Sequence, residues 1–399
     1  MVSIKTLVIF FFSAVAVDAA GVVGKAEGFA ASATGGGSAR PAIPANIKQL
    51  VTWLSDNVPR TIVLDKTWDF TGSMGKKTEK GCMPLASKCG SNSGSHATQL
   101  GINYNGWCTS GNANTAVAQP TITYDVVGLI HNAIKLGSNK SIVGVGTAGK
   151  IKGRGFFIQG AKNIIIQNVE FVELNPQYVW GGDAINVDGT DLLWIDHVKT
   201  SRIGRQHISM GPSASGRVTI SNCEFDGITP WSVECNNEHY WTLYFTGSHD
   251  QITFKGNYIH NASGRGPKVG GLKSSVLPKV FFHAVNNYWS NIRGNAFQIG
   301  KGGSVLAEGN HFEYTTRPVQ FDADATSHAL WSSSSGAAGC QSILGRACSA
   351  NMLVASGGFT GTNTGVLTTA KTMHLCHALP ATNIKAMVLK DAGIGKLRA

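Results

Sequence analysis

The sequence predicts an all-β fold in which the chain winds into a solenoid, and three observations support this prediction. From about residue 120 onward, short runs rich in Val, Ile and Phe alternate with Gly, Asn, Asp and Ser, as strands alternate with turns. These runs share a phrase that repeats along the chain. Only one segment has the periodicity of an amphipathic helix.

The repeated phrase is an apolar run that ends on a polar residue. That residue recurs after 29, 25, 35, 30 and 23 residues, at Asn168, His197, Asn222, Asn257, Asn287 and Asn310. Coils of this length stack into a parallel β-helix, in which a turn asparagine bonds to those of the coils above and below. We expect such a ladder, with the variable coil lengths forming loops on a binding face. A sandwich or barrel is the alternative, and it gives no reason for aligned asparagines.

The single predicted helix lies between Pro44 and Pro59, where apolar residues recur at i, i+3, i+4 and i+7 (Ile47, Leu50, Val51 and Leu54). We expect it to cap the N-terminal end of the solenoid. Farther along, residues 144–149 match the G-x-G-x-x-G pattern of nucleotide-binding loops. Ile151 stands where a phosphate-binding loop needs Ser or Thr, and no helical pattern follows, so a turn between coils is the better interpretation.

The first 20 residues have the order of a secretory signal peptide: Lys5, an apolar run from Leu7 to Val17, then small residues. The run is too short for a permanent membrane anchor, and the absence of arginine disfavours a mitochondrial presequence. We therefore expect a secreted protein with one domain over residues 21–399 and no membrane partner.

The formal net charge is +11. A basic surface attracts polyanions, and acidic polysaccharide fits an exported protein better than nucleic acid, because the basic residues are scattered rather than striped. The alternative is a solvated surface that only aids solubility. Export also makes the eight cysteines disulfide candidates rather than metal ligands. Cys340 and Cys348 are close enough to close a short loop, but spacing does not fix the other pairs.

Longer motifs are more specific. They read Ala-Glu-Gly-Phe-Ala at 26–30, Thr-Gly-Gly-Gly at 34–37, Asp-Lys-Thr-Trp-Asp-Phe-Thr-Gly at 65–72, Tyr-Val-Trp-Gly-Gly-Asp-Ala-Ile at 178–185, Trp-Ile-Asp-His at 194–197, Arg-Ile-Gly-Arg-Gln-His at 202–207 and Ser-Gly-Arg-Gly-Pro-Lys at 263–268. Together they resemble the fungal-type pectin lyases, in the larger group of pectate and pectin lyases that fold as right-handed parallel β-helices. The resemblance spans most of the chain.

The resemblance implies β-elimination on methyl-esterified pectin, with Arg265 as the base. Elimination needs a base at the C5 proton, a cation near the carbonyl and a leaving oxygen at C4. Because arginine stays protonated in water, its site must strongly disfavour the charge, and Arg205 nearby would contribute to that. Asp183 and Arg205 stand where calcium-dependent relatives gather carboxylates, so we expect a fixed cation in place of a metal, and no cofactor. Lys268 is a candidate carbonyl contact or else a solvated turn lysine.

Aromatic side chains in loops would stack on the sugars of an uncharged polymer, and Trp180 and Trp241 are the strongest candidates among Trp107, Trp180, Trp231, Tyr240, Trp241 and Tyr244. Core packing is the alternative for each of them. Trp194, Asp196 and His197 lie on a repeat phrase, so we expect a core tryptophan and a ladder histidine there.

By the same resemblance, Cys82 pairs with Cys108, Cys89 with Cys235, and Cys340 with Cys348. That leaves Cys223, which we expect to be a buried thiol, and Cys376. The chain departs from the family pattern at Leu85, where an aromatic is common, and in a longer stretch at 272–278. Asn139 and Asn261 begin N-glycosylation signals, and we expect only Asn139 to be used, because Asn261 lies close to Arg265.

The sequence thus predicts a secreted, monomeric, endo-acting pectin lyase. Three alternatives stay open. A calcium-dependent pectate lyase would need clustered carboxylates, and a hydrolase would need paired ones, for which Asp183, Asp188 and Asp191 are the loose candidates. A wall-binding protein without catalysis would tolerate loss of Arg265, which this chain retains.

Overall fold

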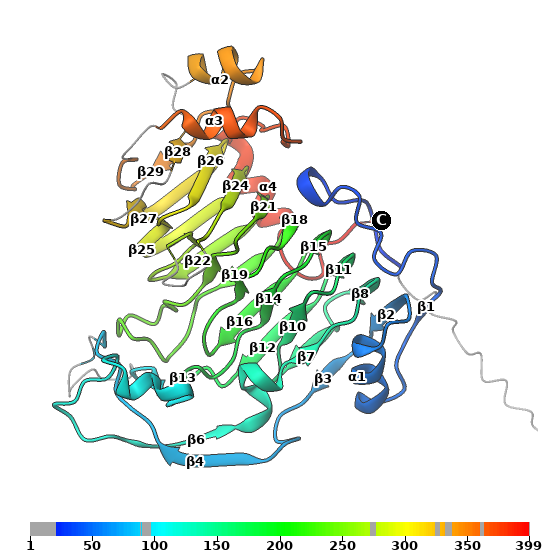
Figure 1. The fold of residues 1–399 in the computed structure, drawn as a ribbon, viewed down its shortest axis with the longest axis vertical. Coiled ribbons are helices and arrows are strands. Elements are labelled where there is room, and N and C mark those ends of the chain that lie inside the picture. The colour runs from blue at the N-terminus through cyan, green and yellow to red at the C-terminus, as the bar shows by residue number, and fades with distance from the viewer. Residues whose placement is uncertain are drawn as a thin grey trace, which may run out of the picture.

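A computed structural model of the protein describes residues 21–87, 89, 97–271, 277–323, 328–331, 337–359 and 363–398. The strands stack into long parallel sheets that wind around one apolar core (Figure 1). This is the predicted parallel β-helix. The predicted signal peptide, residues 1–20, lies outside the described residues, as does most of the 272–278 stretch.

The strands form three faces, and from β7 (Ile134–Lys135) onward the coils contribute a strand to each of them. The first face consists of β7, β10 (Phe156–Gln159), β14 (Ile185–Asp188), β17 (Ile208–Met210), β20 (Leu243–Phe245), β23 (Lys268–Val269) and the C-terminal parts of β25 (Tyr288–Ile299) and β27 (His311–Phe321).

The second face is a continuous ten-stranded sheet. In spatial order it contains β1 (Pro41–Ala42), β2 (Arg60–Leu64), β8 (Lys140–Gly144), β11 (Ile164–Gln167), β15 (Leu193–Asp196), β18 (Gly216–Ser221), β21 (Asp250–Lys255), β24 (Val280–Val285), β26 (Gly303–Glu308) and β28 (His328–Trp331).

The third face joins the first through the long strands β25 and β27. It consists of β3 (Thr67–Asp69), β9 (Lys150–Lys152), β12 (Glu170–Leu174), β16 (Lys199–Ile203), β19 (Glu224–Asp226), β22 (Tyr258–Ala262), the N-terminal parts of β25 and β27, and β29 (Met352–Val354). Two short pairs lie outside the faces: β4 (Lys76–Lys80) with β6 (Thr121–Asp125), and β5 (Leu100–Gly101) with β13 (Tyr178–Val179).

The core consists of columns of apolar side chains that occupy the same position in successive coils. On the second face Ile166 is in register with Ile142 and Ile195, and the column continues through Ile220 to Phe254. All five side chains are fully buried. The repeated apolar run is therefore the inward face of each coil. Residues 144–149 form the turn between β8 and β9, as expected.

The predicted asparagine ladder exists, but only over the later coils. The Asn257 amide donates to the Asn287 side-chain oxygen (2.9 Å), Asn287 donates to Asn310 (2.9 Å), and Asn310 donates to Asn351 (2.8 Å). In the earlier coils the alignment was wrong by one residue. Asn168, His197 and Asn222 have φ of 58°, 50° and 49°, the conformation that Gly256 and Gly309 adopt just before the ladder. The ladder position beside Asn257 is occupied by Cys223, a buried free thiol.

The N-terminal strap, residues 21–37, runs across several coils of the second face. Its backbone N–H groups donate to side chains at four depths: Phe29 to Thr253, Ala30 to Thr219, Val23 to Gln167 and Gly36 to Ser141. Trp194 is buried beneath it with Ala26 and Ala30. Trp194 is thus a core residue, as predicted.

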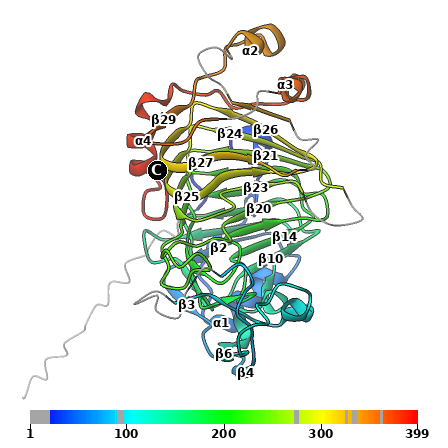
Figure 2. The same cartoon turned by 90° about the vertical axis from the view of Figure 1, so that its left-hand side faces the viewer.

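Helices close the two ends (Figures 1 and 2). The predicted capping helix is α1 (Ile47–Ser55), begun by an Asn46 side chain that accepts from the Gln49 N–H, and Leu50 and Leu54 are buried in the core. Near the other end lie α2 (Ala337–Leu344), α3 (Gly365–Ala370) and α4 (Ile384–Asp391), the last packed on Tyr288. None of the helices among the described residues is long and apolar enough to span a bilayer.

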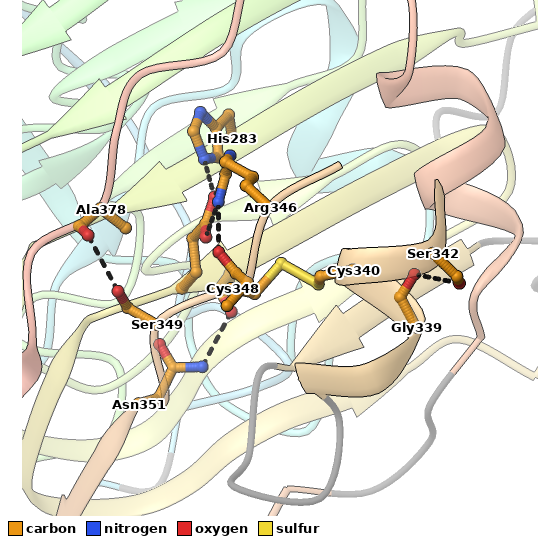
Figure 3. Close-up of a disulfide and its surroundings, with 12 residues drawn as sticks. His283, Gly339, Cys340, Ser342, Arg346, Cys348, Ser349, Asn351 and Ala378 are labelled. Atoms are coloured by element: carbon orange, nitrogen blue, oxygen red, sulfur yellow. Dashed lines mark hydrogen bonds and ion pairs between the residues drawn. A yellow bond between two sulfur atoms is a disulfide. The ribbon is translucent and has the colours of Figure 1, made fainter. Parts of the chain in front are cut away.

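The disulfide between Cys340 and Cys348 closes the loop after α2 and presents Arg346 to the solenoid (Figure 3). Arg346 donates to both oxygens of Glu308, which also contacts His283 at 2.8 Å. Glu308 and His283 are fully buried. Arg346 and His283 hold the pKa of Glu308 at about 2 despite its burial. The other two implied disulfides, Cys82–Cys108 and Cys89–Cys235, are also formed, and Cys376 is a buried free thiol.

Candidate active site

Arg265 lies in the turn between β22 and β23, at the edge of the first face. Its backbone has a φ of 48°, and its carbonyl accepts from the Leu243 N–H at 2.7 Å. The buried Trp289 indole donates to the next carbonyl, that of Gly266, at 2.6 Å. Gly264 must be glycine, because a Cβ there would approach the Tyr240 ring to 2.5 Å. The turn is therefore fixed on both sides of Arg265.

An aromatic shelf made by Tyr240, Trp241 and Tyr244 surrounds the Arg265 guanidinium. The guanidinium carbon lies 4.7 Å from the ring centroid of Trp241, 5.0 Å from that of Tyr244 and 5.8 Å from that of Tyr240. The Arg265 Nε is buried without a hydrogen-bond partner, and Arg265 makes no ion pair with any described carboxylate.

These surroundings change the proton affinity of Arg265. Burial lowers its pKa, and the positive charge of Arg205 lowers it further, whereas the two tyrosines act in the opposite direction. The net effect is a lowered pKa. An arginine that is buried, has no carboxylate partner and lies near a second arginine loses its proton more readily than an arginine in water does.

Arg205 is held by Asp183, whose side chain is fully buried. Arg205 Nε donates to Asp183 Oδ1 at 2.8 Å and its Nη2 donates to Oδ2 at 2.6 Å, a bidentate pair. The Gln206 N–H also donates to Oδ1, at 3.0 Å. Both oxygens of Asp183 are therefore occupied, and the carboxylate holds the Arg205 guanidinium in one orientation.

Trp180, which we expected to stack on a sugar, contacts protein groups on its ring. One of its faces is covered by the Arg205 guanidinium at 3.9 Å, and Tyr104 stacks on the ring at 5.0 Å with an interplanar angle of 25°. With Arg205 and Tyr104 both against it, part of the ring surface is taken up by protein groups. Trp180 positions Arg205, and His131 extends the stack on the far side of Tyr104.

Lys268 is not a solvated turn lysine, and its contact with a substrate carbonyl stays a prediction. It lies on β23, only 9% of its side chain is exposed, and its ammonium donates to Asp322 Oδ2 at 2.7 Å. The Gln298 amide donates to the other oxygen of Asp322 at 2.8 Å. The sequence interpretation failed here because Asp322 lies 54 residues away, on the last turn of a later coil.

The remaining predicted aromatics divide into two groups. The Trp241 indole donates to Gln99 Oε1 at 3.1 Å, and the Gln99 amide donates to the Gly204 carbonyl at 2.6 Å, so this glutamine links the aromatic shelf to the turn that carries Arg205. Trp107 packs against the Cys82–Cys108 disulfide. Trp231 pairs through its backbone with Ala97. No described contact brings Trp107 or Trp231 to either arginine.

Asp196 and His197 lie at the second face, not with Arg265. Asp196 accepts from Ser221, Asn222 and Gln167, and it contacts His197 Nδ1 at 2.7 Å. These are the contacts of a structural network. Likewise, Asn139 is half-buried and accepts from the Asn163 amide at 2.8 Å, and its glycosylation stays a prediction.

One group among the described residues has the composition of a metal site: Glu224, Asp226 and His260 on the third face. The Lys199 ammonium lies 2.8 Å from Glu224 and 3.7 Å from Asp226, so a fixed cation already occupies that group. Around Arg205 the described contacts gather no comparable set of free carboxylates.

Similarity to known proteins identifies the family of this chain. Residues 5–344 match the family model described as "Pectate lyase". The chain is 47% identical over 386 residues to a probable pectin lyase B of Aspergillus niger, covering 96% of both chains. It is 45% identical to pectin lyase B of Emericella nidulans, covering 96% of this chain and 97% of that one. Among solved structures, a pectate lyase bound to a hexasaccharide matches 96% of this chain and 100% of its own with a TM-score of 0.57 at 17% identity, a likeness of fold.

Proposed function

The chain belongs to the pectate lyase family, and from this premise we propose that it is a secreted, endo-acting lyase that cleaves methyl-esterified pectin by β-elimination. The observation that carries the proposal is Arg265, a buried arginine without a carboxylate partner in an aromatic shelf. The two relatives that are 47% and 45% identical to this chain are named a probable pectin lyase B and a pectin lyase B.

In the proposed mechanism, the neutral guanidine of Arg265 removes the C5 proton of a galacturonate methyl ester. The electron pair left on C5 moves toward the ester carbonyl, then forms the C4–C5 double bond as the glycosidic oxygen leaves C4. An ester already acidifies C5, so the site needs less positive charge than a free carboxylate would require. Burial and Arg205 supply the low proton affinity that the base needs.

Arg205 stabilises the charge that develops on the carbonyl oxygen. Asp183 and Trp180 fix its guanidinium before substrate arrives, which is the preorganisation that transition-state stabilisation requires. Trp241, Tyr240 and Tyr244 offer the apolar surface for the sugar rings.

Two alternatives can be weighed on the same contacts. A calcium-dependent pectate lyase would need carboxylates free to bind the ion, whereas both oxygens of Asp183 are engaged by Arg205 and Gln206. For a hydrolase, Asp188 Oδ1 accepts from the Ser213 N–H and Asp191 is paired with exposed Arg217, so neither flanks Arg265. We further propose that the protein acts alone, as a monomer, without a cofactor.

The test is the ultraviolet absorbance of unsaturated uronate released from highly methylated pectin, with and without a chelator. We expect the signal to survive chelation and to disappear in Arg265→Ala. Asp69→Asn, which removes a half-exposed surface carboxylate on β3, is the control and should keep the signal. A signal abolished by the chelator would identify a calcium-dependent enzyme, and no signal in the wild type would contradict the proposal.

A further inference from the structure

We infer that Asp322 contributes to specificity: by pairing with Lys268 it withholds a positive charge from the polymer, and so removes an advantage that free uronate units would otherwise have over methyl-esterified ones. The inference rests on the proposed function, because it concerns the surface on which Arg265 would act.

Lys268 lies beside the aromatic shelf. On the first face it is in register with Tyr244 of β20 on one side and with Gln298 of β25 on the other. Side chains in register on neighbouring parallel strands project to the same side of the sheet. Tyr244 itself lies 5.0 Å from the Arg265 guanidinium. The ammonium of Lys268 is therefore one strand away from a ring that contacts the proposed base.

Asp322 belongs to the same electrostatic group. The positive charges of Lys268 and Arg265 both contribute to lowering its pKa, which stays below the usual value although burial opposes this. Asp322 also acts on the pKa of Tyr244. A carboxylate that interacts with Lys268, Arg265 and Tyr244 at once reduces the positive potential of the whole surface.

Pairing is the shared property of the two cations that flank Arg265. Arg205 is neutralised by Asp183 and Lys268 by Asp322, at 2.6 Å and 2.7 Å. The two pairs cancel, so the net charge of these five residues is set by Arg265 alone: +1 when Arg265 is protonated and zero when it is the neutral base of the proposed mechanism. Because 9% of the Lys268 side chain and 20% of the Asp322 side chain are exposed, water screens the pair weakly.

The consequence is a preference between two forms of one polymer. A free galacturonate carboxylate would gain from an unpaired lysine at this depth, whereas a methyl ester carries no charge and would gain little. With Lys268 neutralised, the aromatic shelf binds both forms about equally, because the free carboxylate gains little electrostatic attraction. Loss of Asp322 would leave Lys268 unpaired and so strengthen the binding of the free acid.

The experiment compares the dissociation constants of the wild type and Asp322→Asn for polygalacturonate and for highly methylated pectin oligomers, by calorimetry at two salt concentrations. At low salt we expect the variant to bind polygalacturonate about fivefold more tightly, with most of the gain lost at about 0.5 M salt. Binding of the methylated oligomers should change less than twofold.

Two variants make the test specific. The double variant Lys268→Gln, Asp322→Asn removes both charges and should return polygalacturonate binding to the wild-type value. Asp69→Asn makes the same change in net charge at a distant pair with Lys152, and should have no effect on either ligand.

The outcomes separate this inference from the proposed function. Unchanged binding of polygalacturonate by Asp322→Asn, an equal gain for both ligands, or a gain that persists in the double variant would each overturn the role of Asp322. These are binding readouts, so they hold whether or not unsaturated product forms. Absence of that product in the wild type would instead contradict the lyase activity.

Discussion

The guanidinium of Arg205 lies 3.9 Å from the ring centroid of Trp180, so the tryptophan supports the arginine. Replacing Trp180 with Ala should therefore lower kcat by about tenfold or more while KM changes little, because the loss falls on transition-state stabilisation. Trp180→Phe keeps a flat ring and should retain most of the activity. Steady-state kinetics on methylated pectin would check this, and a rise in KM alone would show that Trp180 binds sugar.

Tyr240 opposes the lowering of the Arg265 pKa through its hydrogen bond and its charge. Tyr240→Phe removes that effect, so the pKa of Arg265 should fall further and more of the enzyme should carry a neutral base at a given pH. We expect the rising limb of the kcat/KM profile to move to lower pH. Because Phe keeps the ring beside Gly264, the turn should stay intact. A limb that moves to higher pH would contradict this electrostatic account.

Asp250 connects stability to pH. Burial raises its pKa from the usual 3.8 to about 7, and its Oδ2 is buried without a partner. A carboxyl with a raised folded-state pKa stabilises the fold fully below its unfolded pKa and loses that contribution as pH rises through the folded pKa.

We therefore expect the Asp250 carboxyl to lower the free energy of unfolding by on the order of 4 kcal/mol between pH 4 and pH 8. Asp250→Asn should flatten the dependence. The control is Asp191→Asn, which breaks an exposed pair with Arg217 and should leave the slope in this range nearly unchanged. If the slope is the same with and without the Asp250 carboxyl, the assignment is wrong.

Arg346 neutralises a carboxylate that is buried between the second face and the C-terminal segment that covers it. Arg346→Leu leaves the buried Glu308 with only His283, and we expect a loss of about 3 kcal/mol in the free energy of unfolding. The double variant Glu308→Gln, Arg346→Leu should recover much of that loss, since no buried charge is then left uncompensated. Denaturant unfolding of the four combinations would measure the coupling, and additive effects would show that the pair is not coupled.

The sequence predicted the features that repeat. The apolar runs, the helix at α1 and the ladder from Asn257 to Asn310 follow from local pattern, and each is present. The predicted ladder is off by one residue in the earlier coils. Asn168 has the left-handed backbone that Gly256 has in a later coil, and asparagine is common both there and in the ladder, so the sequence does not distinguish the two positions. Only the hydrogen-bond partners separate the two positions.

Within the candidate site, the motif residues were found and their partners were not. Arg205, Asp183 and Arg265 lie together as expected. Tyr104, Gln99 and Asp322 belong to no recognisable motif. Each reaches the site from a different coil or loop once the coils are stacked, so its position in the sequence does not reveal its partner. Trp180 lies against Arg205 and Tyr104, and its role toward the sugar stays a prediction, since nothing in the sequence reveals which neighbours cover an aromatic ring.

The N-terminal strap has a consequence for the order in which the protein is made. The Phe29 N–H can donate to the Thr253 hydroxyl only after Thr253, 224 positions later in the chain, has been synthesised. At a synthesis rate of roughly 5 to 20 residues per second, that acceptor emerges on the order of 10 to 45 s after its donor. The coils can stack in the order of translation, but the strap, although synthesised before them, can complete its contacts only after the coil that carries Thr253 has formed.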